Sequence, residues 1–198
     1  LFRSRVTYVG DESTAPVQPQ VAAHPLRALR QRLEDFHGRH DSHAIPNSWG
    51  HLNHADRFIR YAARTAIEHQ PVAGWSEQAL AEPDPRTQVA ALLALARAAG
   101  IDPEHRRPND PSVNAPLGEK LLTALERVDW NALDDDGRMT LVRTIQIALV
   151  RFGRPDEAHI QRLIAKLDPH FPAATAELNW LLAETDRKST RLNSSHRT

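Results

Sequence analysis

The chain of 198 residues contains no cysteine. It therefore cannot form a disulfide, a thiolate zinc site or the Cys-x-x-Cys-His attachment of a c-type haem. No apolar run approaches the roughly 18 to 20 residues that a membrane-spanning helix needs. Residues Leu1 to Arg5 also lack the apolar stretch that follows the start of a secretory signal. We expect no membrane span in this chain, and we expect it to be an internal piece of a longer protein because it lacks an initial Met.

Neither sign of charge is in excess, because 25 Lys and Arg balance 25 Asp and Glu. Residues Asp186 to Thr198 carry a net charge of +3, which leaves −3 for residues 1 to 185. A nucleic-acid-binding domain normally concentrates basic residues on one face, so we expect no nucleic-acid partner. Gly-rich phosphate loops, Gly-x-Ser-x-Gly elbows and His-Glu-x-x-His helices are missing as well. The sequence therefore predicts no catalytic residue within this chain.

The clearest pattern that is present is an amphipathic helix from Asp56 to His69. Asn53 or Asp56 can cap its first turn, and Pro71 cannot continue it. Its apolar side chains recur at the spacing that places them on one helical face, namely Phe58, Ile59, Ala62, Ala63, Ala66 and Ile67. The opposite face carries Arg57, Arg60, Arg64 and Glu68. The small Ala residues predict a closely packed second helix, which residues 72 to 81 can provide.

Similar apolar helices follow along the chain, separated by Pro, Gly, Asn and Asp. The pattern predicts helices over residues 25–36, 72–81, 86–99, 117–128, 138–152, 157–167 and 173–183. A short, poorly formed helix is expected over residues 47–52, and residues 100–116 read as an inserted loop. Residues 1–10 are predicted to be a detached β-strand and residues 11–24 an extended linker. Residues 25–184 are thus expected to form an all-α domain, an α-solenoid or curved helical array.

The end of the chain departs from this helical pattern at Asp186. Residues 186–196 can be back-translated into DNA that resembles a common short-read sequencing adapter along its whole length. We therefore expect residues 186–198 not to belong to the natural protein, and residues 185–198 to be disordered.

Five histidines lie close together in the sequence, on both sides of a polar loop: His37, His40, His43, His51 and His54. Imidazole clusters can hold zinc, copper or nickel. Gly38 and Pro46 interrupt any regular helix here, and no Cys or well-placed carboxylate completes a ligand set. A polar surface is therefore the preferred interpretation, and a metal site remains the alternative.

Three other groups of residues have a structural and a functional interpretation. Asp134, Asp135 and Asp136 lack the alternating acid spacing of a calcium loop, so helix capping is preferred. The basic stripe formed by Arg57, Arg60 and Arg64 could receive a carboxylate or phosphate, but a solvated face paired with Asp56 and Glu68 is the commoner case. The four tryptophans, Trp49, Trp75, Trp130 and Trp180, are spaced about once per helical unit, which favours anchors between stacked helices.

Several stretches resemble known proteins. The pattern Asp56-x-x-x-Arg60-x-x-Ala63-x-x-Ala66, followed by a second amphipathic helix, is similar to a unit of a HEAT-like repeat. Residues 1–16 resemble the last β-propeller strand and exit of large exported bacterial proteins of planctomycete type. Residues 29–38 and 56–75, and later residues 153–156, 162–172 and 177–179, resemble the helical region that follows that propeller.

The resemblance implies which kind of protein this chain belongs to, but it assigns no catalytic residue within the chain. In that family a sugar-dehydrogenase-like propeller precedes HEAT-like helices and a c-type cytochrome domain usually follows, so the parent would be an exported, periplasmic oxidoreductase that holds c-type haem. This chain is then expected to be a non-catalytic scaffold or docking module. Its partners would be the other domains of the same chain, or another protein. The alternative is an enzymatic or metal-binding module built on the His37 to His54 cluster.

Overall fold

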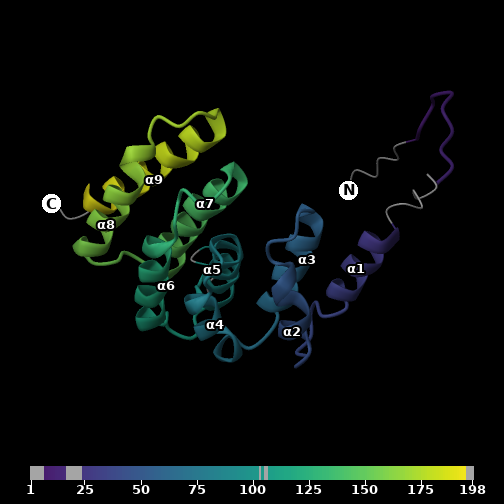
Figure 1. Cartoon of the computed structure of the whole chain (residues 1–198), viewed down its shortest axis with the longest axis horizontal. Coiled ribbons are helices and arrows are strands. Elements are labelled where there is room, and N and C mark those ends of the chain that lie inside the picture. Colours follow the sequence, from purple (N-terminus) through teal and green to yellow (C-terminus); the bar gives the residue numbers. More distant parts are fainter. Residues whose placement is uncertain (1–6, 17–23, 103, 105–106, 195–198) are drawn as a thin grey trace.

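The computed structural model describes residues 7–16, 24–102, 104 and 107–194, with the backbone alone for residues 24 and 186–194. The chain folds into an all-α array (Figure 1). Its helices are α1 (His24–Glu34), α2 (Ala44–Ser48), α3 (Arg57–Glu68), α4 (Ser76–Ala81), α5 (Pro85–Ala99), α6 (Ala115–Arg127), α7 (Asp135–Phe152), α8 (Glu157–Leu167) and α9 (Ala176–Ser194). Short 3-10 turns at Trp49–His51, Val72–Gly74 and Asp168–His170 extend α2, precede α4 and extend α8.

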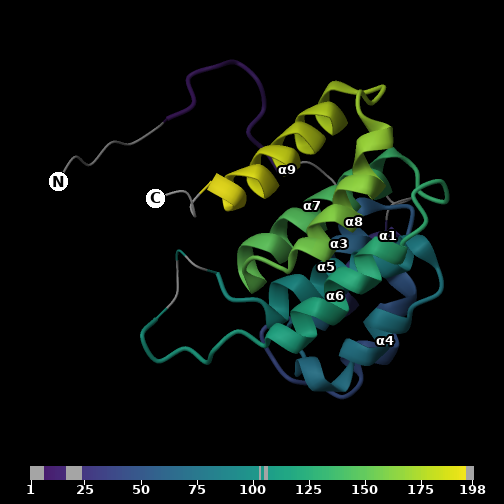
Figure 2. The same cartoon turned by 90° about the vertical axis from the view of Figure 1, so that its left-hand side faces the viewer.

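The helices form two curved layers. Helices α1, α3, α5, α7 and α9 pack side by side in one layer, and α4, α6 and α8 pack in the other. Figure 1 shows an arch in which the first layer lines the concave side and α2, α4, α6 and α8 lie on the convex side. Figure 2 shows the helices of both layers from the end of the array, with the loop that precedes α6 extending away from them. The predicted all-α helical array is confirmed.

Helix α5 lies at the centre of the core. Its residues Val89, Leu92 and Leu95 are almost fully buried. It packs against α3 and α7 in its own layer and against α4 and α6 in the other. A helix that contacts neighbours on so many sides needs apolar residues nearly all round. The sequence pattern of α5 predicts this central place, and the structure confirms it.

Side chains of the residue before the helix cap the starts of α3, α5, α6, α7 and α8. Asp56, Asp84, Asn114, Asp134 and Asp156 each accept a hydrogen bond from a backbone N–H in the first turn. These bonds satisfy amides that have no partner within the helix. The capping role preferred for the Asp134 to Asp136 triplet is therefore confirmed for Asp134.

At the two ends of the chain the structure differs from the sequence-based expectations or does not describe the residues concerned. Most of the strand expected over residues 1–10 falls on residues 1–6, outside the described residues, and residues 7–10 form no strand. Of the expected linker, residues 11–16 are irregular and exposed, and residues 17–23 lie outside the description. Helix α9 continues to Ser194, whereas the sequence predicts a helix end at Ala183 and a disordered tail from residue 185.

The expected role of the tryptophans as anchors is correct for most of them. Trp75 and Trp130 are buried and Trp49 is half-buried. The indole of Trp49 also donates a hydrogen bond to Glu82, with Nε1 at 2.7 Å from Oε2. Trp180 is 63% exposed, so its predicted role as an anchor is wrong. The inward positions of α9 are occupied by Leu178 and Leu182 instead, and Trp180 falls between them on another face.

Candidate binding surfaces

The five histidines singled out from the sequence do not converge. His37 lies after α1, and its Nε2 is 2.9 Å from the carbonyl oxygen of Ala62 in α3. His43 contacts the carboxylate of Asp41 through Nδ1 at 3.1 Å. His40 is exposed on the loop between them. The loop thus separates these three imidazoles and gives two of them protein partners.

The other two histidines form a pair of their own. The rings of His51 and His54 lie edge to face with centroids 6.1 Å apart. Nδ1 of His54 accepts a hydrogen bond from the backbone N–H of Asp56, just before α3. Burial, with the nearby charges of His54 and Arg32, lowers the pKa of His51. Among the described residues, no three His, Cys, Asp or Glu side chains are grouped so that they could hold a metal ion.

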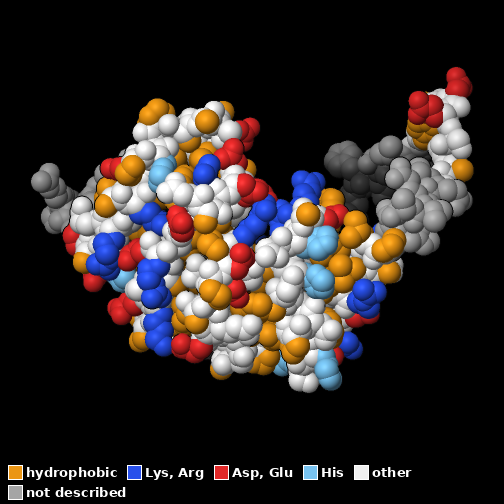
Figure 3. All heavy atoms as spheres, viewed as in Figure 1, with side chains coloured by type: hydrophobic (Ala, Val, Ile, Leu, Met, Phe, Trp, Pro, Cys, Tyr) orange, Lys and Arg blue, Asp and Glu red, His pale blue; other side chains and the backbone are white. Residues whose placement is uncertain are grey.

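A hollow on the concave side spans α3, α5 and α7, and we call it the arginine groove. Its cavity volume is about 190 Å³. It is lined by Leu52, Arg57, Arg60, Tyr61, Arg64, Arg86, Val89, Ala90, Leu93, Asp136, Gly137 and Thr140. Figure 3 shows basic and acidic side chains next to one another along the hollowed upper edge of the arch. The structure therefore brings the arginine stripe of α3 together with residues far away in the sequence.

Two of the groove arginines form ion pairs with the start of α7. Arg60 pairs with Asp136, and Arg86 pairs with Asp134. Arg60 also donates hydrogen bonds from Nη1 to the carbonyl oxygens of His54 and Ala55, at 2.9 and 3.0 Å. These bonds fix the guanidinium of Arg60 against the protein. For Arg60, the expected pairing with Asp56 or Glu68 is wrong, because its partner Asp136 comes from α7, far away in the sequence.

Arg64 has a different environment. Its side chain is 17% exposed and its guanidinium lies 5.2 Å from the centre of the Tyr61 ring. Nε lies 3.3 Å from the carboxylate of Glu68 but without hydrogen-bond geometry, so it is a buried donor with no hydrogen-bond acceptor in the described structure. Burial lowers the pKa of Arg64; the charge of Glu68 opposes this effect and the charge of Arg97 adds to it. An arginine stays protonated at neutral pH all the same, so a positive charge is held in a poorly solvated place.

Arg57 is exposed at the start of α3 and forms no ion pair with the described residues. Its guanidinium lies 4.8 Å from the centre of the Phe58 ring. Phe58 and Tyr61 are themselves more than half exposed. One edge of the groove therefore presents two cations, each next to an aromatic ring. An arrangement of this kind can bind an oxyanion, but it includes no nucleophile or general base that would react with one.

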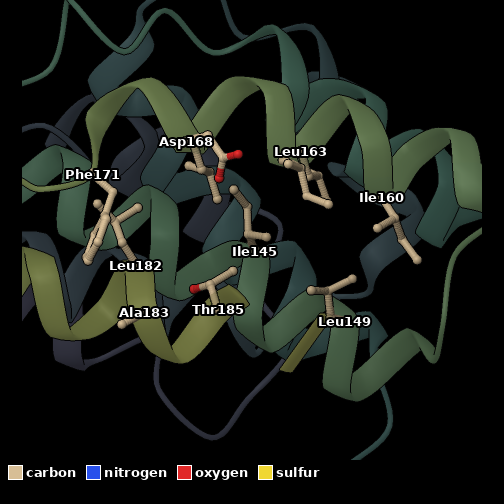
Figure 4. Close-up of a pocket in the computed structure, with 11 residues that line it drawn as sticks. Ile145, Leu149, Ile160, Leu163, Asp168, Phe171, Leu182, Ala183 and Thr185 are labelled. Carbon is tan, nitrogen blue, oxygen red and sulfur yellow. The ribbon is translucent and has the colours of Figure 1, made fainter. Parts of the chain in front are cut away.

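A second and larger hollow, the terminal groove, lies between α7, α8 and α9 (Figure 4). Its cavity volume is about 540 Å³, and it is lined by Ile145, Leu149, Ile160, Leu163, Ile164, Leu167, Asp168, Phe171, Leu182, Ala183 and Thr185. The hydroxyl of Thr185 donates to the carbonyl of Leu181 and accepts a hydrogen bond from Gln146, so it is already engaged. The lining is otherwise apolar except for Asp168. The terminal groove can bury apolar surface, and its residues offer no reactive pair.

Sequence reasoning missed a polar cluster between α6 and α8, in the layer on the convex side. The carboxylate of Glu126 accepts a hydrogen bond from Nε of Arg162 at 2.7 Å and contacts Nδ1 of His159. Nζ of Lys166 donates to the carbonyl oxygens of Glu126 and Val128 at the end of α6, and burial lowers the pKa of Lys166. His159, Arg162 and Lys166 are three and four residues apart, so they share one face of α8. That spacing was a usable signal, and the cluster's role is to join the two helices.

Comparisons of this chain with protein families, with curated proteins and with solved structures give no match. Among the described residues, no helix combines the length and the apolar character that crossing a membrane requires.

Proposed function

We propose that this chain is a non-catalytic helical scaffold that holds other parts of a protein at a fixed separation and offers its concave side for docking. The observation that supports this proposal is a single buried core that runs from Leu33 in α1 to Leu182 in α9. Because neighbouring helix pairs share this core, they cannot bend against one another without exposing apolar surface. A scaffold needs this rigidity and needs no reactive group.

The resemblance described above extends the proposal to a parent protein. In this scheme a β-propeller precedes the helical array, a c-type cytochrome domain follows it, and the whole protein is exported to the periplasm. The haem would belong to the cytochrome domain, because this chain has no cysteine to attach it. The array would then set the distance and orientation between propeller and haem. Sequencing the gene beyond the codon for Thr185 tests this scheme: a downstream Cys-x-x-Cys-His motif is expected, and a stop codon soon after α9 would contradict it.

The scaffold proposal itself is tested by measuring distances within the array. The absence of cysteine allows two dyes to be attached at introduced thiols only, at Gln31→Cys in α1 and Gln161→Cys in α8, both of which are exposed. Single-molecule energy transfer between the dyes is expected to give one narrow distribution. The same labelled chain in urea is the control and should give a broad distribution at lower transfer. Two or more native populations, or a broad native distribution, would refute a rigid scaffold.

A further inference from the structure

The arginine groove holds more positive charge than its own acids neutralise. Four arginines line it, Arg57, Arg60, Arg64 and Arg86, and Asp136 is the acid in its lining. Asp134 on the rim pairs with Arg86. Arg64 contacts the carboxylate of Glu68, which is shared with Arg97. Charge complementarity therefore favours a negatively charged occupant.

The hydrogen-bond pattern shows where that occupant would bind. The guanidinium groups of Arg57 and Arg64 donate no hydrogen bond to the described part of the chain. Arg64 is nevertheless held in position by the Tyr61 ring and by Glu68. A planar guanidinium with free donors matches the two oxygens of a carboxylate. Partial burial strengthens such a pair, because water screens it less than at an open surface.

The volume and the lining of the arginine groove favour a polypeptide over a free metabolite as its ligand. The volume of about 190 Å³ is below the roughly 300 to 1,000 Å³ of typical small-molecule pockets. It suits one or two side chains of a longer partner that continues along the concave side. Beyond Arg86 in its first turn, α5 contributes only apolar residues to the lining, namely Val89, Ala90 and Leu93. A ligand that fits this lining presents an apolar side chain beside its acidic groups.

We propose that the arginine groove is a docking site for an acidic polypeptide segment. One Asp or Glu carboxylate binds Arg64, a neighbouring carboxylate binds Arg57, and an apolar side chain between them lies on Ala90 and Leu93. This inference rests on the proposed docking function and specifies its partner. The basic stripe on α3 is then a recognition surface at Arg57 and Arg64, while Arg60 belongs to the fold.

The test measures binding of a fluorescein-labelled peptide to the full chain by fluorescence anisotropy. The peptide carries pairs of Glu flanking single Leu residues, and a second peptide replaces every Glu by Gln. The acidic peptide is expected to bind, more weakly as salt rises, and the Gln peptide is not. The double variant Arg57→Gln with Arg64→Gln is expected to raise the Kd roughly 10- to 100-fold, the range for lost hydrogen bonds to charged groups. The matched control, Arg30→Gln with Arg127→Gln, removes the same charge from α1 and α6 and should leave the Kd unchanged.

The single variant Arg57→Gln separates a loss of binding from a loss of folding. Arg57→Gln changes an exposed side chain that contacts Phe58, so the chain should keep its thermal stability. Its expected effect on Kd is about two- to fivefold, since one exposed ion pair is lost. Equal Kd values for wild type and both groove variants would overturn the proposal, and so would an equal loss in the control variant. Tighter binding of a single-stranded RNA of the same charge would assign the groove to nucleic acid instead.

The outcome is distinguishable from failure of the scaffold proposal. A chain that gives one narrow dye-to-dye distribution and binds neither peptide keeps the scaffold and loses the acidic partner. A chain with a broad distribution that still binds the Glu peptide through Arg57 and Arg64 keeps the docking site and loses the rigid scaffold.

Discussion

The ring of Phe152 at the end of α7 lies against two glycines, and this contact makes a sharp prediction for Gly118→Ala. An added Cβ at Gly118 would lie 2.8 Å from Cδ1 of Phe152 and 3.1 Å from its Cβ and Cγ. These atoms are close to the backbone of Phe152 and cannot swing aside easily. On its other side the ring lies against Gly100, where an added Cβ would be 3.0 Å from Cε2 of Phe152. The ring therefore has little room to retreat.

Two opposing effects decide the sign for Gly118→Ala. Ala is favoured over Gly in a helix interior by about 1 kcal/mol. Overpacking of a filled site costs about 1 to 3 kcal/mol. Since Phe152 is half-buried, we take the middle of that range and expect a net loss of about 1 kcal/mol in the free energy of unfolding.

Urea unfolding measures this change as a lower midpoint with an unchanged slope. Gly74→Ala is the control, because nothing lies within 4 Å of an added Cβ there, and it should not lower the midpoint. Combining Gly118→Ala with Phe152→Leu should recover part of the loss, with a coupling energy of about 0.5 to 2 kcal/mol. If Gly118→Ala alone raised the midpoint, helix propensity would be the larger effect and the close contact would not constrain the site.

Three further predictions concern a cap, the histidines and the tail. The pKa of Asp84 is lowered chiefly by the hydrogen bonds that its carboxylate accepts from Thr87. Because the pKa is lower in the folded state than in the unfolded state, the contribution of Asp84 to stability is complete above about pH 4 and is lost as the pH falls further. Asp84→Ala should therefore cost about 0.5 to 2 kcal/mol at pH 7 in urea unfolding, and this cost should shrink as the pH falls below about 4. Asp84→Asn should cost less than Asp84→Ala at pH 7. Calorimetric titration with zinc or copper should show no tight stoichiometric binding, and tight binding abolished by His37→Ala with His40→Ala would favour the metal-binding alternative. Deleting residues 186–198 should leave the melting temperature unchanged, since Thr185 is the last residue whose described side chain contacts α7; a drop of several degrees would show that the tail belongs to the fold.

The helices and their starts could be predicted from the sequence because their causes are local. Asp56, Asp84 and Asp156 each cap a helix that begins at the next residue, and an apolar stripe follows each of them. The place of α5 could also be predicted, since a helix that is apolar nearly all round must be surrounded. Local chemistry therefore determines which segments are helical and which one is central.

The binding surfaces could not be predicted because they depend on which helices become neighbours. Arg60 and Asp136 are 76 residues apart in the sequence, and only the packing of α3, α5 and α7 in one layer brings them together. Closeness in the sequence was also misleading for the histidines. His37 is turned toward the Ala62 carbonyl, while His51 and His54 lie beyond α2. Neither the long-range ion pair nor the separated imidazoles leave a signature in residue spacing.

Asp134 shows how the local and the long-range structure are connected at the groove. Its Oδ1 accepts a hydrogen bond from the backbone N–H of Gly137 at 2.9 Å, and its Oδ2 binds Arg86 of α5. One carboxylate therefore starts α7 and also anchors the arginine at the rim. Asp136, in the first turn of the same helix, binds Arg60 of α3. Because the acids that suit the positive end of α7 also hold these two arginines, the start of α7 fixes the rim of the groove. Within the described residues, Arg57 and Arg64 are the groove arginines that donate no hydrogen bond, so they are the ones that the proposal assigns to a partner.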